Sequence, residues 1–289
     1  MKKEIKQIHR AMPVNMGGIV LDQALPVQGL DAIDPILLIH HWKTTHPGGQ
    51  NAKDLGVPPH PHRGFSPVTL VFQGEVHHRD SMGFSEVIPA GGTQWMNSGK
   101  GIMHSERPSQ KLAEEGGDFE IIQFWMNSPA KYKLDDPFYK TVLPEETPNV
   151  FFDEGNIKIG VVAGEFHDVT GPVSAMSESI VLRAETKESK EVNIQLPEGM
   201  KTLDYVLEGG IEINQQLLGT KEMAVLSDTG EELTLKSNIA SKFIILGGEP
   251  LNEPVKTYGP IVMNTQAEII EALNAVQNGE FGELVEKFD

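Results

Sequence analysis

Two short stretches, PHPHRGF at residues 59–65 and GIMHSE at residues 101–106, decide how this sequence is interpreted. Each contains two potential metal ligands separated by one residue: His60 with His62, and His104 with Glu106. In an extended strand, side chains at positions i and i+2 point to the same face, about 6–7 Å apart along the chain. Two such strands lying side by side would direct three imidazoles and one carboxylate at one point. We therefore predict that these four side chains bind a single metal ion.

The sequence around these pairs predicts strands. Short runs rich in β-branched and aromatic residues recur along the chain, and 29 glycines and 19 prolines separate them at a spacing typical of a β-sandwich or β-barrel. Examples are VTLVF (68–72), FEIIQFW (119–125), IKIGVV (157–162) and KFIIL (242–246). The expected fold class is all-β.

One helix is expected near the C-terminus. Thr265 and Glu268 have the spacing of a capping box, in which each side chain binds a free backbone amide of the first turn. An apolar face follows at Ile269, Ile270, Leu273 and Val276, and Gly279 is a suitable end. We expect this helix to serve packing.

A weak internal repeat suggests two tandem barrels. VTLVFQG at residues 68–74 resembles LDYVLEG at residues 203–209, an offset of 135 residues. We therefore predict an N-terminal barrel over residues 1–135, and a C-terminal barrel with the helix over residues 136–289. The same offset places the four candidate ligands on Gln195, Pro197, Ile239 and Ser241, which cannot rebuild the site. Only the first barrel is expected to bind metal.

The amino-acid composition limits which metals, nucleic acids and membranes this chain can be expected to bind. There is no cysteine, so disulfides and thiolate zinc sites are excluded, and any metal must bind nitrogen and oxygen. The 24 basic and 41 acidic residues give a net charge of −17, which disfavours direct nucleic-acid binding. No apolar run approaches the roughly 20 residues of a membrane helix, and no secretory signal follows the basic residues at the N-terminus. The expected location is the cytoplasm.

The ligand set is compatible with several metals. Three histidines and one glutamate accept Fe(II), Ni(II), Mn(II), Cu(II) or Zn(II), and the carboxylate favours an octahedral centre over a closed tetrahedral zinc site. Four protein ligands on an octahedron leave two open positions, as an oxygenase requires.

The other histidines of the N-terminal half are interpreted differently. His77 and His78 are adjacent, so at most one can face inward, and both are interpreted as structural or exposed. His40, His41 and His46 precede the first motif, and a place at the rim of the cavity is a minor alternative for them.

The motifs resemble the pirin family of the cupin superfamily. Besides residues 59–65, the matching segments are DPILL (34–38), HRDSMG (78–83), QWMN (94–97), GKGIMHSE (99–106) and GPIVMNT (259–265). The resemblance implies a bicupin with one metal ion, Fe(II) being favoured, in the N-terminal barrel. It also implies that His60, His62, His104 and Glu106 are the ligands.

Two functions of different kinds follow from the resemblance. Several pirins are associated with quercetin 2,3-dioxygenase activity, so the leading hypothesis is a dioxygenase for a flavonol or similar aromatic substrate and O2, with Glu106 also acting as general base. The alternative is a metal-dependent regulator that binds another protein, and a third, inert possibility is a structural bicupin with bound zinc. A wide cavity favours the enzyme, and a filled pocket beside an exposed apolar patch favours the regulator.

Overall fold

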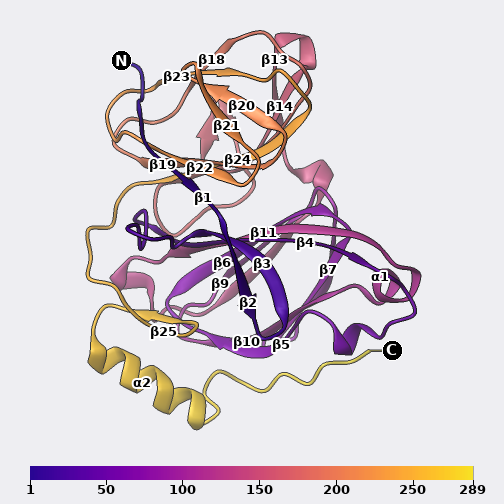
Figure 1. The fold of residues 1–289 in the computed structure, drawn as a ribbon. Coiled ribbons are helices and arrows are strands. Elements are labelled where there is room, and N and C mark those ends of the chain that lie inside the picture. Colours follow the sequence, from indigo (N-terminus) through magenta and orange to yellow (C-terminus); the bar gives the residue numbers. More distant parts are fainter. Residues whose placement is uncertain (289) are drawn as a thin grey trace. The chain divides into compact units, whose positions relative to one another are not determined.

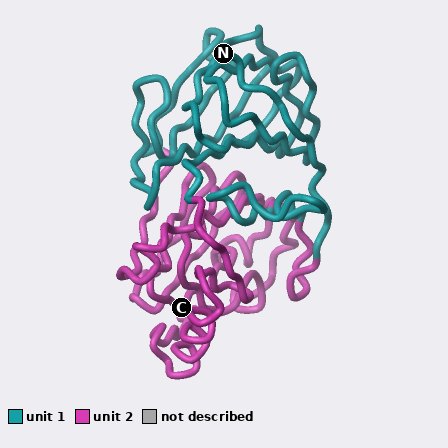
Figure 2. The backbone as a smooth tube through the Cα atoms, turned by 90° about the vertical axis from the view of Figure 1, so that its left-hand side faces the viewer, with its two compact units in different colours: residues 1–14, 22–40, 145–251 teal, residues 15–21, 41–144, 252–289 magenta. Residues whose placement is uncertain are grey.

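The computed structural model describes residues 1–288, in which strands dominate (Figure 1). The chain divides into two compact units, shown in Figure 2. Unit 1 comprises residues 1–14, 22–40 and 145–251, and unit 2 comprises residues 15–21, 41–144 and 252–289. Each unit is therefore assembled from three stretches of chain. The predicted domains, residues 1–135 and 136–289, follow chain order instead, and as folding domains they stay a prediction.

Two sheets carry the histidine-rich part of the chain. The first has seven strands in the order β12-β9-β6-β11-β4-β3-β2. Their bounds are β2 (Met12–Met16), β3 (Ile19–Leu25), β4 (Ile36–His46), β6 (Phe65–Gln73), β9 (Thr93–Asn97), β11 (Gly117–Asn127) and β12 (Phe138–Val142). The second has four strands in the order β5-β10-β7-β8, namely β5 (Val57–His62), β7 (Glu75–Asp80), β8 (Ser85–Pro89) and β10 (Ile102–Pro108).

Unit 1 contains a second seven-stranded sheet and a second four-stranded sheet. The larger has the order β1-β22-β19-β24-β17-β14-β13 and the smaller the order β18-β23-β20-β21. The bounds are β1 (Ile5–Arg10), β13 (Asn149–Phe152), β14 (Ile157–Ala163), β17 (Ser179–Thr186), β18 (Val192–Gln195), β19 (Lys201–Glu208), β20 (Gly210–Ile213), β21 (Gln216–Gly219), β22 (Glu222–Leu226), β23 (Glu232–Lys236) and β24 (Ser241–Gly248).

The two sets of sheets repeat one strand order. The series β9-β6-β11-β4-β3 corresponds to β22-β19-β24-β17-β14, and β5-β10-β7-β8 corresponds to β18-β23-β20-β21. The strands β6 and β19, which contain the two repeated segments of the sequence, occupy equivalent places. The topology therefore agrees with the predicted duplication. In unit 1 the equivalents of β5 and β10 are β18, with the sequence VNIQ, and β23, with the sequence ELTLK.

The interiors of the two units differ in polarity. Unit 1 has a continuous core of aliphatic and aromatic side chains, with Ile159, Leu182, Val206, Leu235 and Phe243 among its members. Burial of such surface stabilises the fold by about 25 cal/mol per Å². Unit 2 also has apolar clusters, one of them around Val71, Ile88 and Phe119, but many of its strands bury polar side chains as well. This polar interior is where the candidate site lies.

The predicted C-terminal helix is confirmed as α2 (Gln266–Gln277). Glu268 N donates to Thr265 Oγ1 over 3.2 Å, and Thr265 N donates to Glu268 Oε2 over 2.7 Å, which completes the capping box. Ile269 packs with Ile261 and Met263. Ile270 was expected on this face but is 52% exposed, because the next residue of a helix is turned by about 100°.

The remaining elements are short. The helix α1 (Gln110–Glu115), which the sequence patterns did not predict, begins after its N-cap Ser109. Two small hairpins pair β15 (Glu165–Phe166) with β16 (Val169–Thr170) and β25 (Lys256–Tyr258) with β26 (Ile261–Met263). Single 3-10 turns lie at Ala52–Asp54, Ala130–Tyr132, Pro144–Glu146 and Asp153–Gly155. Within residues 1–288, none of the helices has both the length and the apolar character needed to cross a membrane.

Candidate metal centre

The two sequence motifs form neighbouring strands, as predicted. The edge strand β5 pairs with β10 in antiparallel register, and His60 and His104 are direct partners across the pair. Prolines at positions 58, 59 and 61 hold this part of β5 extended, and their missing N–H groups are tolerated because the strand lies at an edge. Gly64 ends the motif with φ of +86°, where a Cβ would overlap the carbonyl oxygen of Val262. Glycine is therefore required at this turn.

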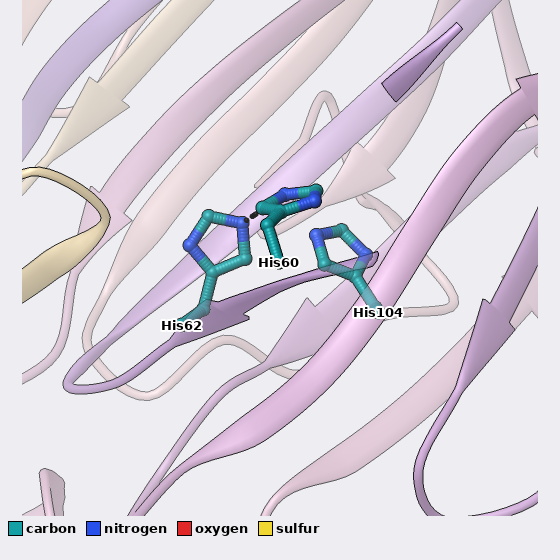
Figure 3. Close-up of side chains that lie close together, drawn as sticks. All are labelled: His60, His62 and His104. Atoms are coloured by element: carbon teal, nitrogen blue, oxygen red, sulfur yellow. Dashed lines mark hydrogen bonds between the residues drawn. The ribbon is translucent and has the colours of Figure 1, made fainter. Parts of the chain in front are cut away.

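Three imidazole rings converge in unit 2 (Figure 3). One ring nitrogen from each of His60, His62 and His104 lies within 4.8 Å of the others. The ring centroids are 4.3 Å apart for His60 and His104, and 4.7 Å apart for the other two pairs. Among residues 1–288, this is the one cluster of three or more such side chains with metal-binding spacing.

Backbone carbonyls determine which nitrogen of His60 and His62 is free. His60 Nδ1 donates to Pro58 O over 2.8 Å, and His62 Nδ1 donates to Pro260 O over 3.2 Å. A carbonyl oxygen only accepts, so in the neutral rings both Nε2 atoms carry a lone pair and no hydrogen. These two Nε2 atoms are nevertheless only 3.0 Å apart. His104 Nε2 is buried and has no hydrogen-bond partner within residues 1–288. Three nitrogens arranged in this way fit a bound cation.

Burial keeps the three rings in the form that binds metal. Loss of hydration lowers the pKa of His60, and it lowers the pKa of His62 and His104 well below the usual range of histidine. The proximity of His60 lowers the pKa of His62 and of His104 further. The three imidazoles are therefore neutral near pH 7, and a metal ion need not displace protons from them.

Glu106 lies beside this cluster and is held by neutral donors. Its Oε1 accepts hydrogen bonds from Thr69 Oγ1 (2.9 Å) and Gln94 Nε2 (2.8 Å), and its Oε2 accepts one from Gln123 Nε2 (2.6 Å). It is close enough to His60 to raise the pKa of that ring by its charge. The group of potential ligand atoms that lie within 4.8 Å of one another consists of three histidine nitrogens and contains no oxygen of Glu106. Glu106 as the fourth ligand therefore stays a prediction.

His78 lies closer to the cluster than the sequence indicated. Of the two alternatives that the sequence offers for His78, structural or exposed, the structure excludes the exposed one, because His78 is fully buried and stacks on Tyr139 with ring centroids 4.0 Å apart. Its Nε2 bonds Asp80 Oδ2 over 2.9 Å, and its Nδ1 lies 3.5 Å from His104 Nδ1. The H-x-D spacing of His78 and Asp80 in β7 was the available signal, because i and i+2 share a face.

The other histidines lie outside the cluster. His77 faces away from His78 and bonds Ser85 Oγ over 2.9 Å. His40 Nε2 bonds Gln23 Oε1, and the buried His41 bonds Glu120 Oε1, each over 3.1 Å. His46 packs its ring against Phe119.

The fold and this cluster define the chain as a two-domain protein of the cupin type with a histidine-based candidate metal centre. Residues 18–126 match the pirin family, and residues 181–282 match the pirin C-terminal cupin domain. The chain belongs to the pirin family.

Relatives with high coverage carry two kinds of name. A Pseudomonas aeruginosa protein named "putative quercetin 2,3-dioxygenase" is 35% identical over 86% of this chain and 87% of its own length. Pirin-1 of Arabidopsis thaliana is 32% identical over 96% of this chain and 94% of its own. The crystal structure of quercetin 2,3-dioxygenase from Acinetobacter baumannii superposes with a TM-score of 0.93 at 35% identity, covering 99% of this chain and all of that one.

Proposed function

We propose that this pirin is a metal-dependent dioxygenase that cleaves quercetin or a related flavonol with O2. The observation that carries the proposal is the convergence of three neutral imidazoles beside a carboxylate, with the Nε2 atoms of His60 and His62 free of hydrogen because their Nδ1 atoms donate to backbone carbonyls. Relatives named as quercetin 2,3-dioxygenases support the substrate class.

In this proposal His60, His62 and His104 bind the metal ion and Glu106 completes the ligand set. Fe(II) is the favoured ion, and the same donors accept Zn(II), Ni(II), Mn(II) or Cu(II). When bound, such an ion supplies Lewis-acid and redox chemistry toward the substrate and O2.

Glu106 is the group we assign to proton transfer. Its three hydrogen-bond donors, Thr69, Gln94 and Gln123, are neutral, so they orient the carboxylate without neutralising its charge. A negatively charged, oriented oxygen is suited to accept the proton of a substrate hydroxyl, in addition to binding metal.

The aromatic side chains around the cluster suit a planar substrate. Trp125 lies edge-on to His62 with ring centroids 5.7 Å apart and packs on Phe65 at 4.4 Å. Offset and edge-to-face contacts of this kind favour aromatic ligands.

We further propose a cytoplasmic location, which the absence of cysteine supports.

The test is metal analysis followed by oxygen uptake. Protein purified without oxygen would be analysed for its metal content, reconstituted with Fe(II) and then separately with Ni(II), Mn(II) and Cu(II), and mixed with quercetin. We expect consumption of O2 in proportion to loss of the flavonol. Absence of O2 uptake with every metal and every flavonol tested would reject the enzyme, and a metal-dependent protein-binding regulator would replace it.

A further inference from the structure

We propose that His78 and Asp80 are positioning residues that fix His104 with its Nε2 lone pair directed at the metal centre. The inference rests on the metal site proposed above. It gives a role to two buried side chains of β7 that are not themselves among the three candidate ligands.

Asp80 is fixed by the turn that follows β7. Its Oδ1 accepts hydrogen bonds from the backbone N–H groups of Met82 (2.9 Å) and Phe84 (3.1 Å). Its Oδ2 accepts the hydrogen bond from His78 Nε2 at 2.9 Å. Gly83, with φ of +97°, provides the backbone conformation of this turn. The carboxylate therefore has a set orientation, with one oxygen for the backbone and the other for His78.

This orientation determines the positions of two protons. A carboxylate oxygen only accepts, so His78 carries its proton on Nε2 and a lone pair on Nδ1. That Nδ1 lies 3.5 Å from His104 Nδ1, at the long end of the hydrogen-bond range. His104 Nδ1 is then the donor, and Nε2 of His104 keeps the lone pair. This is the buried nitrogen for which the described part of the chain offers no hydrogen-bond partner.

In all three candidate ligands the hydrogen is on Nδ1 and the lone pair on Nε2, but different partners accept the Nδ1 hydrogen bond. His60 and His62 each donate from Nδ1 to a backbone carbonyl, which no side-chain substitution removes. His104 instead depends on the side chains of His78 and Asp80. Strand pairing holds them in place, because Asp80 is the cross-strand partner of His104 in the pair of β7 with β10. Side chains that orient a metal-binding histidine in this way commonly contribute 10–100-fold to metal affinity.

The decisive variant is Asp80→Asn. The two backbone N–H groups of Met82 and Phe84 require an acceptor, so the amide oxygen of the asparagine replaces Oδ1 and its NH2 group faces His78. An NH2 group donates, so His78 Nε2 becomes an acceptor, its Nδ1 carries the proton, and His104 must accept on Nδ1. The hydrogen of His104 then moves to Nε2, where it must be displaced before that nitrogen can bind metal, so the affinity falls.

Two quantities are measured: which nitrogen of His104 carries the hydrogen in the metal-free protein, and the affinity of the protein for metal. We expect imidazole ¹⁵N NMR to show His104 protonated on Nδ1 in the wild-type protein and on Nε2 in Asp80→Asn. Affinity for Ni(II), measured by competition with a chelator, should fall about 10–100-fold. The matched control is His77→Gln on the same strand, because the His77 side chain faces away from the cluster and bonds Ser85, and it should change neither reading.

A second variant keeps the inference testable if Asp80→Asn does not fold. His78→Phe retains a ring to stack on Tyr139 but removes the nitrogen that faces His104, so Ni(II) affinity should again fall while the thermal midpoint stays near that of the wild-type protein. An unchanged His104 state in Asp80→Asn, or wild-type Ni(II) affinity in both folded variants, would overturn the inference. If the wild-type protein bound no metal, the proposed function would fail, and NMR of the metal-free protein would still decide the inference.

Discussion

His62 is buried, its Nδ1 donates to the carbonyl of Pro260, and its Nε2 lies 3.0 Å from Nε2 of His60 in the cluster. The variant His62→Ala should therefore lose metal binding by more than the roughly 10–100-fold typical of an outer partner. Amide hydrogen exchange of β17, β19 and β24 should remain slow, because unit 1 has its own apolar core.

His77→Ala is the control for this variant. Its ring contacts Ser85 on the neighbouring strand, so metal affinity should change little. Near-native affinity in His62→Ala would show instead that His62 is not a ligand.

Glu106→Gln separates metal binding from proton transfer. The amide oxygen can still coordinate weakly, but the amide cannot accept a proton near neutral pH. One of its atoms also becomes a donor, and it must face Gln123 or the pair of Thr69 and Gln94. We expect partial retention of metal and a fall in turnover of about 10²–10⁴-fold.

Three measurements would be made on this variant: metal content, oxygen uptake and the pH profile of the rate. Loss of turnover with metal retained would support the role of base. Full metal content with unchanged turnover would remove Glu106 from the mechanism.

At the scale of the elements, β19 contains an unusual residue. Asp204 is fully buried, pairs across the sheet with Ala224 and Ile245 of the apolar core, and both of its carboxyl oxygens lack a hydrogen-bond partner among the described residues. Burial raises the pKa of Asp204 to about 8. In the repeated sequence it corresponds to Thr69 of β6, which bonds Glu106. The equivalent position is thus polar in both units. In unit 2 its side chain bonds Glu106, whereas in unit 1 it lies in the apolar core.

The pH dependence of stability follows from the raised pKa of Asp204. The unfolded chain ionises this carboxyl above about pH 4, whereas the folded protein keeps it neutral up to about pH 8. The contribution to stability is therefore most favourable below pH 4, declines as the pH rises to about 8, and is constant above. The decline has an upper bound on the order of 5 kcal/mol.

Asp204→Asn should remove this decline, because an amide of the same shape does not ionise. Its thermal midpoint should exceed that of the wild-type protein by several degrees at pH 8, and the difference should shrink toward pH 4. Asp168→Asn, at an exposed position of the same unit, is the control and should leave the pH dependence unchanged. Parallel curves for the wild-type protein and Asp204→Asn between pH 4 and pH 8 would contradict the prediction.

At the scale of the whole molecule, we expect one metal ion per chain. The strands of unit 1 that are equivalent to β5 and β10 contain no histidine, and their residues Ile194, Leu233 and Leu235 belong to the apolar core. Metal analysis of the saturated protein should give a stoichiometry near one, and His62→Ala should remove that ion. Retention of an ion in His62→Ala, located within unit 1, would show that the duplication preserved a second site.

The local features of this protein could be predicted from its sequence. Alternation within a strand placed His60 with His62, and His104 with Glu106, on common faces, and turn residues and apolar runs predicted the all-β class. The capping box of α2 and the duplication were also readable, because both depend on residues close in sequence or on a repeated pattern. The motif residues supported the family, which the comparisons confirmed.

Contacts between residues far apart in the sequence could not be predicted and are seen only in the folded structure. Pro260 accepts from His62 across 198 positions of the chain, and Gln94 and Gln123 reach Glu106 from two different strands. The same is true of His78 beside His104, and of the assembly of each unit from three separate stretches. The physical reason is that side-chain alternation fixes the face of each strand, whereas the order and register of the strands arise from packing and hydrogen bonds between segments far apart in sequence.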